Sequence, residues 1–261
     1  MDIGMRISSC QLIFLGCAAA ALLGACAPLE RAAPRAQHEP VAQANQLATH
    51  VPPFSGQSAG ILPQGWKPWI LNRQKVATEY QLAQEGTRIA LRADAASSAS
   101  GLYVPLVPGK RRHLRWEWKT DNWIEAAENS SRQREDSPLR IFVAFGGDIA
   151  TLPLKDQLMF EMARVTTGRE MPYATLMYIW GARRPVGSVV ANPHTDRVRM
   201  IVVDSGKGEI GRWRAHERDL QADYRKAFGA DPGPVLALGV MTDTDNTKSH
   251  VRAWYGDIVL D

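Results

Sequence analysis

Short runs of alternating apolar and polar residues fill much of the chain after residue 75, and they constrain its fold more than any other feature. In the clearest run, Leu114, Trp116 and Trp118 are separated by charged residues. Because side chains alternate between the two faces of a strand, the three apolar residues share one face. Similar strands are predicted at 76–83, 87–93, 141–145, 174–180, 186–190, 198–203, 210–214, 235–241 and 251–260. About a dozen short strands with turns between them are typical of a two-sheet sandwich.

Two helices are predicted between the strands. The first follows Pro153, and the second ends at Gly229, a residue type that commonly terminates helices. Apolar residues recur at helical spacing in both, at Leu154, Leu158, Met162 and Val165 in the first and at Leu220, Tyr224 and Phe228 in the second. The expected fold is therefore mainly β, a jelly-roll-like sandwich of two sheets with two short helices.

The N-terminus carries the features of a lipoprotein signal. Arg6 precedes an apolar run that ends in the sequence Leu23-Gly24-Ala25-Cys26. Small residues before a cysteine suit a lipoprotein signal peptidase, and the cysteine then receives the lipid. We expect residues 1–25 to be removed and Cys26 to become the acylated N-terminus. A plain secretory signal that is cleaved elsewhere is the alternative. A permanent transmembrane helix is disfavoured, because it needs about 20 apolar residues.

This signal predicts where the protein works. A lipid on Cys26 would tether the protein to a bacterial membrane in the cell envelope. Ala27 follows the cysteine, and the absence of aspartate there favours the outer membrane, with the protein facing the periplasm. Cys10 and Cys17 would leave with the signal, so that the mature chain would have no cysteine pair for a disulfide.

Composition changes after the signal. Residues 26–61 are mostly rich in Ala, Pro and Gln and poor in large apolar residues, and we expect a flexible linker there. Residues 62–261 are expected to form one β-sandwich domain. Residues 125–137 are polar and charged, which predicts a long exposed loop.

The charge of the chain limits its partners. The formal net charge is only +4, and the basic residues are scattered. The chain has neither zinc-finger spacing nor an aromatic RNA-binding signature, so nucleic acid is not an expected partner. The membrane, reached through the N-terminal lipid, and a saccharide or polymer of the envelope are the expected partners.

A polar turn near the C-terminus is the first candidate binding site. Asp243, Asp245 and Asn246 follow an apolar strand, and with Asp257 they offer the oxygen ligands that Ca²⁺ prefers. We predict a structural calcium site with Asp243, Asp245 and Asp257 as ligands, or a site at which Asp243, Asp245 and Asn246 bind a polar organic ligand. The alternative is that these side chains only cap a tight turn.

Asp196, Arg197 and Arg199 form the second candidate site. Val198, Met200 and Val202 are expected to point into the core, so the two arginines would share the opposite face. There they could hold a carboxylate or phosphate group. A solvated face with ordinary ion pairs is the alternative.

Tryptophans add a third possibility, because indole rings stack on the C–H faces of sugars. Trp116 and Trp118 are expected in the core. Trp123, Trp180 and Trp213 lie beside polar residues and are the candidates for exposed stacking.

Catalytic motifs are missing from the sequence. There is no Gly-x-Ser-x-Gly elbow, no His-Glu-x-x-His, no P-loop and no Gly-x-Gly-x-x-Gly. The histidines are scattered along the chain. A glycosidase that uses two carboxylates remains an alternative, although the sequence does not single out a pair.

Several phrases of the sequence resemble the bacterial DUF3047 family. They are the segments at 65–68, 100–102, 116–118, 195–203, 223–229, 240–247 and 255–258, and the resemblance extends over about residues 62–261. No activity follows from it, and its layout is similar to jelly-roll carbohydrate-binding modules, which is an analogy of fold alone. We therefore expect a non-catalytic lipoprotein whose sandwich domain binds a saccharide or envelope polymer. The alternatives are a glycan-acting envelope hydrolase and a structural protein that binds another protein.

Overall fold

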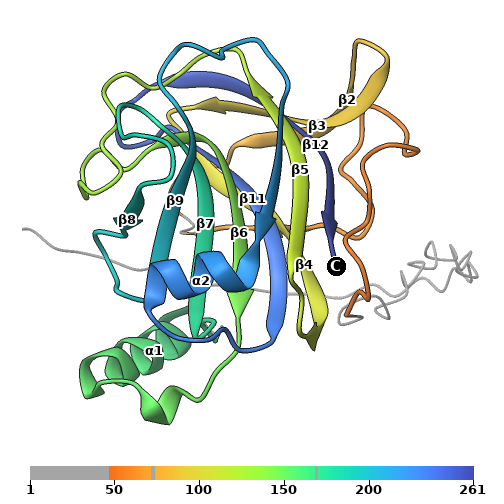
Figure 1. Ribbon diagram of the computed structural model, residues 1–261. Coiled ribbons are helices and arrows are strands. Elements are labelled where there is room, and N and C mark those ends of the chain that lie inside the picture. Colours follow the sequence, from red (N-terminus) through yellow and green to blue (C-terminus); the bar gives the residue numbers. More distant parts are fainter. Residues whose placement is uncertain (1–46, 72–73, 168–169) are drawn as a thin grey trace, which may run out of the picture. The chain divides into compact units, whose positions relative to one another are not determined.

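The computed structural model describes residues 47–261, except 72–73 and 168–169 (Figure 1). Two sheets make up the domain, as the sequence predicts. The first contains seven strands in the order β1 (Lys67–Trp69), β4 (Ala99–Gly109), β11 (Val235–Asp243), β6 (Ser137–Phe145), β7 (Ala174–Gly181), β9 (Val198–Ser205) and β8 (Val189–Ala191). The second contains five strands in the order β10 (Arg214–Asp219), β5 (His113–Thr120), β12 (His250–Leu260), β3 (Arg88–Ala96) and β2 (Glu79–Glu85). Neighbouring strands are antiparallel, apart from the parallel pair β7 and β9.

The main core lies between the two sheets. Trp118 on β5, Tyr178 on β7 and Tyr255 on β12 are completely buried in it. Such large apolar faces account for the stability of the sandwich, because apolar burial is worth about 25 cal/mol per Å². The expectation of a mainly β sandwich with two helices is confirmed, and Trp116 and Trp118 are core residues as predicted.

The seven-stranded sheet is buried on its other face as well. Phe142, Met177, Met200 and Met241 form a second apolar cluster there, against which Val198 and Trp69 pack. A sheet that is covered on both faces has strands that are apolar at nearly every position. This explains why every residue of β6 and β7 is buried.

Strand boundaries differ from the prediction at three places. The strand expected at 210–214 is β10, which begins only at Arg214. The strand expected at 186–190 is β8 and begins at Val189, and the strand expected at 76–83 is β2 and begins at Glu79. The sequence pattern also did not single out β4, which lies between β1 and β11 in the seven-stranded sheet. Pro105 and Pro108 interrupt it, and proline within a run argues against a strand because it cannot donate to the ladder.

Both predicted helices are present, α1 (Leu154–Thr167) and α2 (Leu220–Phe228), together with a short 3₁₀ helix at Ile149–Thr151. The side chain of Asp219 caps α2 by accepting hydrogen bonds from its first turn, and Gly229 ends the helix at a φ of 73°. Leu220 and Tyr224 of α2 are buried in the main core. In the described residues, no helix is long and apolar enough to cross a bilayer.

The first helix exposes the apolar stripe that was used to predict it. Its four members are 57–78% exposed (Leu154, Leu158, Met162 and Val165), whereas Phe160, on another face of the helix, is buried. Figure 1 shows α1 at one end of the sandwich, between β6 and β7 in the chain. Helical spacing therefore predicted the helix but not the face that packs on the domain.

The folded domain begins earlier than residue 62. Val51 and Phe54 are buried in the main core, and the ring of Phe54 stacks on that of Trp66 at 4.9 Å between centroids. Ala48 forms a bridge to Leu106. The expectation of a linker that extends to residue 61 is thus corrected, because residues from about 48 onward pack on the domain. The predicted signal at 1–25 and Cys26 lie outside the described residues.

Candidate functional site

One face of the five-stranded sheet points away from the core and carries charged and aromatic side chains. Residues that pair across the strands place Arg115, Glu117 and Lys119 of β5 on this face, as the sequence pattern predicted. Trp254 of β12 shares the face because it pairs with Lys119, and Glu217 of β10 because it pairs with Arg115. We call this surface the polar sheet face and define it by Arg88, Arg115, Glu117, Lys119, Trp213, Glu217 and Trp254.

Cations hold the two tryptophans of the polar sheet face in place. The guanidinium of Arg88 lies 4.6 Å from the centre of the Trp213 ring. The ammonium of Lys119 lies 4.2 Å from the Trp254 ring and 5.8 Å from that of Trp213. Such contacts stabilise a cation over an indole face. Trp213 is half-buried and Trp254 is buried, so Trp213 is the tryptophan of this face that a ligand can reach.

Carboxylates complete the polar sheet face. Glu117 forms an ion pair with Arg88, and Glu85 forms one with Lys119. Arg88 and Glu117 belong to β3 and β5, which are separated by β12. Gly256 of β12 makes the pair possible, because a Cβ atom there would lie 2.5 Å from Cγ of Glu117. The charged groups are thus held side by side without a side chain between them.

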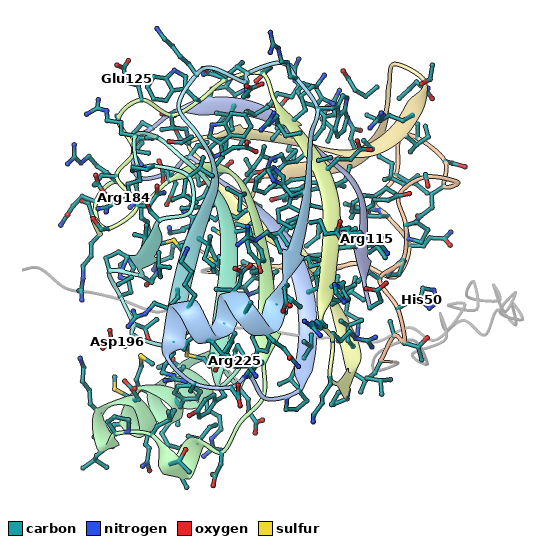
Figure 2. The ribbon with its side chains drawn as sticks, in the orientation of Figure 1. His50, Arg115, Glu125, Arg184, Asp196 and Arg225 are labelled. Carbon is teal, nitrogen blue, oxygen red and sulfur yellow. The ribbon has the colours of Figure 1, made fainter. Side chains whose placement is uncertain are left out.

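A shallow groove adjoins this arrangement. It has a volume of about 400 Å³ and is lined by Arg115, Trp116, Glu117, Ala215, His216, Glu217, Asp257 and Val259. Ala215 pairs with Glu117 at one end of the lined segments of β5 and β10, where its small side chain leaves space beside the longer ones. Figure 2 shows Arg115 on the side of the domain formed by β5 and β12. Glu117 lines the groove and also forms an ion pair with Arg88, whose guanidinium lies over Trp213. The groove and the two tryptophans therefore form one continuous surface.

The turn that follows β11 forms a second candidate site with a residue that the sequence did not single out. Asp136 is completely buried, just before β6. Its carboxylate accepts hydrogen bonds from the backbone nitrogens of Asn246 (3.1 Å) and Thr247 (2.7 Å) and from the Thr247 hydroxyl (2.5 Å). One oxygen each from Asp136, Asp243 and Asp245 lie within 4.8 Å of one another. Asp136 was missed because it lies in the polar stretch at 125–137, which was expected to be an exposed loop. In the structure, Asn129 and Asp136 of this stretch are buried.

Buried charges surround Asp243. Its side chain is 5% exposed and contacts the guanidinium of Arg140 at 3.2 Å, and Arg140 is itself 3% exposed. Burial raises the pKa of the Asp243 carboxyl well above its usual value, and the nearby Asp136 and Asp245 add to this effect, although Arg140 opposes it. Burial would raise the pKa of Asp245, but the hydrogen bond from Lys75 and its positive charge help to lower it. The opposite shifts of these two neighbouring carboxyls follow from their different partners and burial.

Asn246 lies in the same turn but is engaged within the protein. Its side-chain nitrogen donates to the backbone oxygen of Arg132 at 2.8 Å. Asp257, in contrast, is not part of this group. Its carboxylate accepts hydrogen bonds from the backbone nitrogens of Phe54 (2.6 Å) and Ser55 (2.9 Å). The three residues predicted as calcium ligands therefore do not all meet: Asp257 lies elsewhere, and Asp136 is the third carboxylate beside Asp243 and Asp245.

The predicted group at 196–199 is not brought together with the turn after β11 and its carboxylates Asp136, Asp243 and Asp245, which we call the acidic turn. Arg199 lies 3.5 Å from Asp196, and Arg197 lies 4.4 Å over the ring of Tyr173 and donates to the Tyr173 backbone oxygen at 2.8 Å. Val198, Met200 and Val202 belong to the outer apolar cluster of the seven-stranded sheet, whereas Ile201 and Val203 belong to the main core. The expected inward face of β9 was therefore the wrong one. Figure 2 shows Asp196 far from Arg115 of the polar sheet face.

The three tryptophans proposed for stacking differ in exposure. Trp180 is 1% exposed, and its ring N–H donates a hydrogen bond to the backbone oxygen of Gly206, so the ring cannot stack on a ligand. Trp123 packs against a small apolar cluster that includes Ile124 and Val251. Only Trp213 of the three lies on the polar sheet face.

A buried aspartate joins the two sheets at one edge. Asp204 of β9 accepts hydrogen bonds from the Trp118 ring nitrogen (2.7 Å), the His216 ring nitrogen Nε2 (2.7 Å) and Arg214 (3.1 Å). Burial alone would raise the pKa of Asp204, but hydrogen bonds from these three residues outweigh it and lower the pKa. Because the aspartate is 3% exposed, this network stabilises the fold and offers little surface to a ligand.

Comparisons with solved structures find β-rich domains of low sequence identity. A family 29 carbohydrate-binding module, CBM29-2, in complex with mannohexaose is 12% identical, with coverage of 81% of this chain and 88% of that chain and a TM-score of 0.34. The K2 cleaved adhesin domain of Lys-gingipain is 8% identical, with coverage of 80% and 95% and a TM-score of 0.38. No curated protein matches the sequence.

A comparison with protein families gives a match over most of the domain. The matching family is described as a protein of unknown function (DUF3047), and the match covers residues 64–259. These bounds include all strands from β1 to β11 and nearly all of β12. They therefore contain the polar sheet face and the acidic turn. The chain belongs to the DUF3047 family.

Proposed function

We propose that this protein is a lipid-anchored component of the bacterial envelope that binds a saccharide on the polar sheet face. The observation that carries the proposal is the placement of Trp213 beside paired cations and carboxylates, next to an open groove. The proposal concerns binding and not catalysis.

The chemistry of this surface suits a sugar. A pyranose ring has an apolar C–H face and a rim of hydroxyl groups that both donate and accept hydrogen bonds. Trp213 offers an apolar surface with a polar nitrogen at its edge. Arg88 and Lys119 can donate to hydroxyls, and Glu117 can accept from them.

Rigid placement of these groups favours binding further. Arg88 and Glu117 already hold each other, and Lys119 is fixed between Glu85 and Trp254. Side chains that are ordered before binding lose less conformational entropy when the ligand arrives. The alternation of Arg and Glu also gives a surface of mixed charge, which suits a neutral saccharide better than a strongly charged one.

The first prediction concerns Trp213. The protein without its first 26 residues is titrated calorimetrically with soluble fragments of envelope polysaccharide and with neutral hexasaccharides. Replacing Trp213 with alanine should weaken binding by at least about 2 kcal/mol, roughly a thirtyfold rise in Kd, because central tryptophans carry much of the energy of a binding surface. The measurement is the Kd of the two proteins for the same fragment.

Trp123→Ala is the matched control, because this tryptophan packs away from the polar sheet face. It should bind the fragment as the wild type does. Equal affinity of Trp213→Ala and wild type would rule out the polar sheet face as the binding surface. Release of reducing ends by the wild type, lost in Glu217→Gln, would instead favour the glycan-acting hydrolase.

The second prediction concerns the anchor. Cys26→Ser should release the protein from membranes and abolish the incorporation of labelled fatty acid, because the thiol of Cys26 is the proposed site of the lipid. The measurement is membrane fractionation with acyl labelling in bacteria that express each form. Cys17→Ser is the control and should leave both unchanged. A Cys26→Ser protein that remains membrane-bound and normally processed would contradict the anchor.

A further inference from the structure

Three carboxylates that are far apart in the sequence meet beside the turn after β11. Asp136 belongs to the segment before β6, Asp243 is the last residue of β11, and Asp245 lies in the turn itself. One oxygen from each lies within 4.8 Å of the other two. Carboxylate oxygens at this spacing can contact one ion, since calcium ligands surround the ion at 2.3–2.6 Å.

One of these oxygens is buried and has no donor. Asp243 is 3% exposed. Among the described residues, its Oδ2 has Arg140 as a donor, but its Oδ1 has no hydrogen-bond partner. A buried acceptor without a partner is costly, so an unpaired atom in a native structure calls for an explanation such as an ion. The two other carboxylates each have an oxygen within 4.8 Å of a carboxylate oxygen of Asp243.

The balance of charge also favours a cation. Three carboxylates face two direct cationic partners, Arg140 on Asp243 and Lys75 on Asp245. The carboxyl groups of this cluster thus outnumber the cationic side chains that contact them directly. Arg140 is buried and fixed, whereas the ammonium of Lys75 is 34% exposed and sits at the end of a flexible chain. An arriving cation can therefore displace Lys75 from Asp245.

We propose that Asp136, Asp243 and Asp245 form a binding site for a divalent cation, with Ca²⁺ preferred. The ligands are all oxygens, and the group contains no histidine or cysteine that would favour zinc. Because water would complete the shell, the longer and more flexible calcium bonds suit this irregular set better than the strict octahedron of Mg²⁺. The site is separate from the polar sheet face and does not depend on saccharide binding.

Hydrogen bonds between protein groups hold the turn in its conformation. Asp136 holds Asn246 and Thr247 by three hydrogen bonds. The backbone hydrogen bonds between Thr244 and Ser98 and between Ser249 and Thr244 hold it as well. The cation would therefore bind to a folded turn, and its effect should be additional stability of a domain that folds without it.

The test uses the purified full-length protein, with CaCl₂, MgCl₂ or chelator. Because the ion binds the folded state and not the unfolded chain, saturation should raise Tm by roughly 5–11 °C at a calcium concentration a hundredfold above Kd. Calorimetric titration with CaCl₂ should give a single site, and MgCl₂ should bind more weakly.

Two variants give opposite expectations. Asp243→Asn keeps the shape of the side chain and an oxygen for Arg140 but removes the charge that pairs with the buried Arg140. Its Tm in chelator should therefore be lower than that of the wild type, and calcium should no longer raise it. Lys75→Gln removes the competing ammonium, and its calcium affinity should rise at least threefold. Asp257→Asn is the matched control, because Asp257 contacts Phe54 and Ser55 instead. Its calcium response should equal that of the wild type.

Several results would overturn the site. If the Tm and the heat of titration of the wild type are unaffected by both ions, the protein has no such site. If Asp243→Asn still responds to calcium, Asp243 is not a ligand. If Asp257→Asn folds but does not respond, the proposed set of ligands is wrong. Magnesium binding at equal or higher affinity would refute the preference for calcium.

Discussion

Replacing Asp136 with alanine is expected to lower the free energy of unfolding by about 4 kcal/mol or more. The carboxylate is completely buried and accepts three hydrogen bonds from Asn246 and Thr247. Hydrogen bonds to a charged group contribute about 1.5–3 kcal/mol each, and the donors would be left without a partner. For a domain of this size the loss corresponds to a decrease in Tm of roughly 8–16 °C. Chemical denaturation in the presence of chelator measures it without any contribution from bound ions.

Asp196→Ala is the control for this prediction. Its side chain is 69% exposed, and changes at such positions usually alter stability by no more than about 0.5 kcal/mol. If Asp136→Ala lost less than 1 kcal/mol under the same conditions, the turn after β11 would not depend on Asp136. Thr247→Val tests the same contact through its donor, because it removes the hydroxyl group that donates a hydrogen bond to Asp136.

Replacing Asp204 with asparagine is expected to lower the free energy of unfolding by about 3–5 kcal/mol at pH 7. Asp204 is the shared acceptor of Trp118, His216 and Arg214 at the edge where β9 faces β10. Removing one partner from a buried group of charges costs about this much, because the remaining groups stay desolvated. An asparagine would also place an amide nitrogen against one of these donors.

The pH dependence of this difference follows from the lowered pKa of Asp204. A carboxyl whose pKa is lower in the folded state than in the unfolded chain stabilises the fold above its unfolded pKa, which is about 3.9. The contribution is lost as the pH falls through the folded pKa. The difference in stability between wild type and Asp204→Asn should therefore narrow only below about pH 4.

Denaturant titrations of both proteins from pH 7 to pH 3 measure this narrowing. Asp231→Asn is the control, because its side chain is 74% exposed and its ion pair with Arg225 lies at the surface. It should differ little from the wild type at every pH. Equal stability of wild type and Asp204→Asn at pH 7 would contradict the role of this carboxylate.

Local patterns in the sequence predicted the elements of secondary structure. Alternation at 114–119 is a property of adjacent residues, and it correctly placed Trp116 and Trp118 in the core and the charged residues of β5 on the opposite face. Spacing likewise predicted both helices, and the terminal glycine of α2 predicted its end. Such signals need no knowledge of the rest of the chain.

Patterns failed where both sides of an element are apolar or where partners are distant. Alternation in β9 could not say which set of residues faces the main core, since both sets are buried by different clusters. The stripe on α1 marked a helix, but the tertiary structure left that stripe exposed. Only packing decides which apolar face is covered.

The sequence by itself determined the mainly β fold and the family, and it pointed to the turn with Asp243 and Asp245 as a polar group. The tertiary structure decided which residues join that turn. Asp136 lies more than 100 positions earlier in the chain, and the pairing of β11 with β6 brings it there, while Asp257 is held by Phe54 and Ser55. Contacts of this kind depend on strand order and register, which are long-range properties that no local pattern encodes.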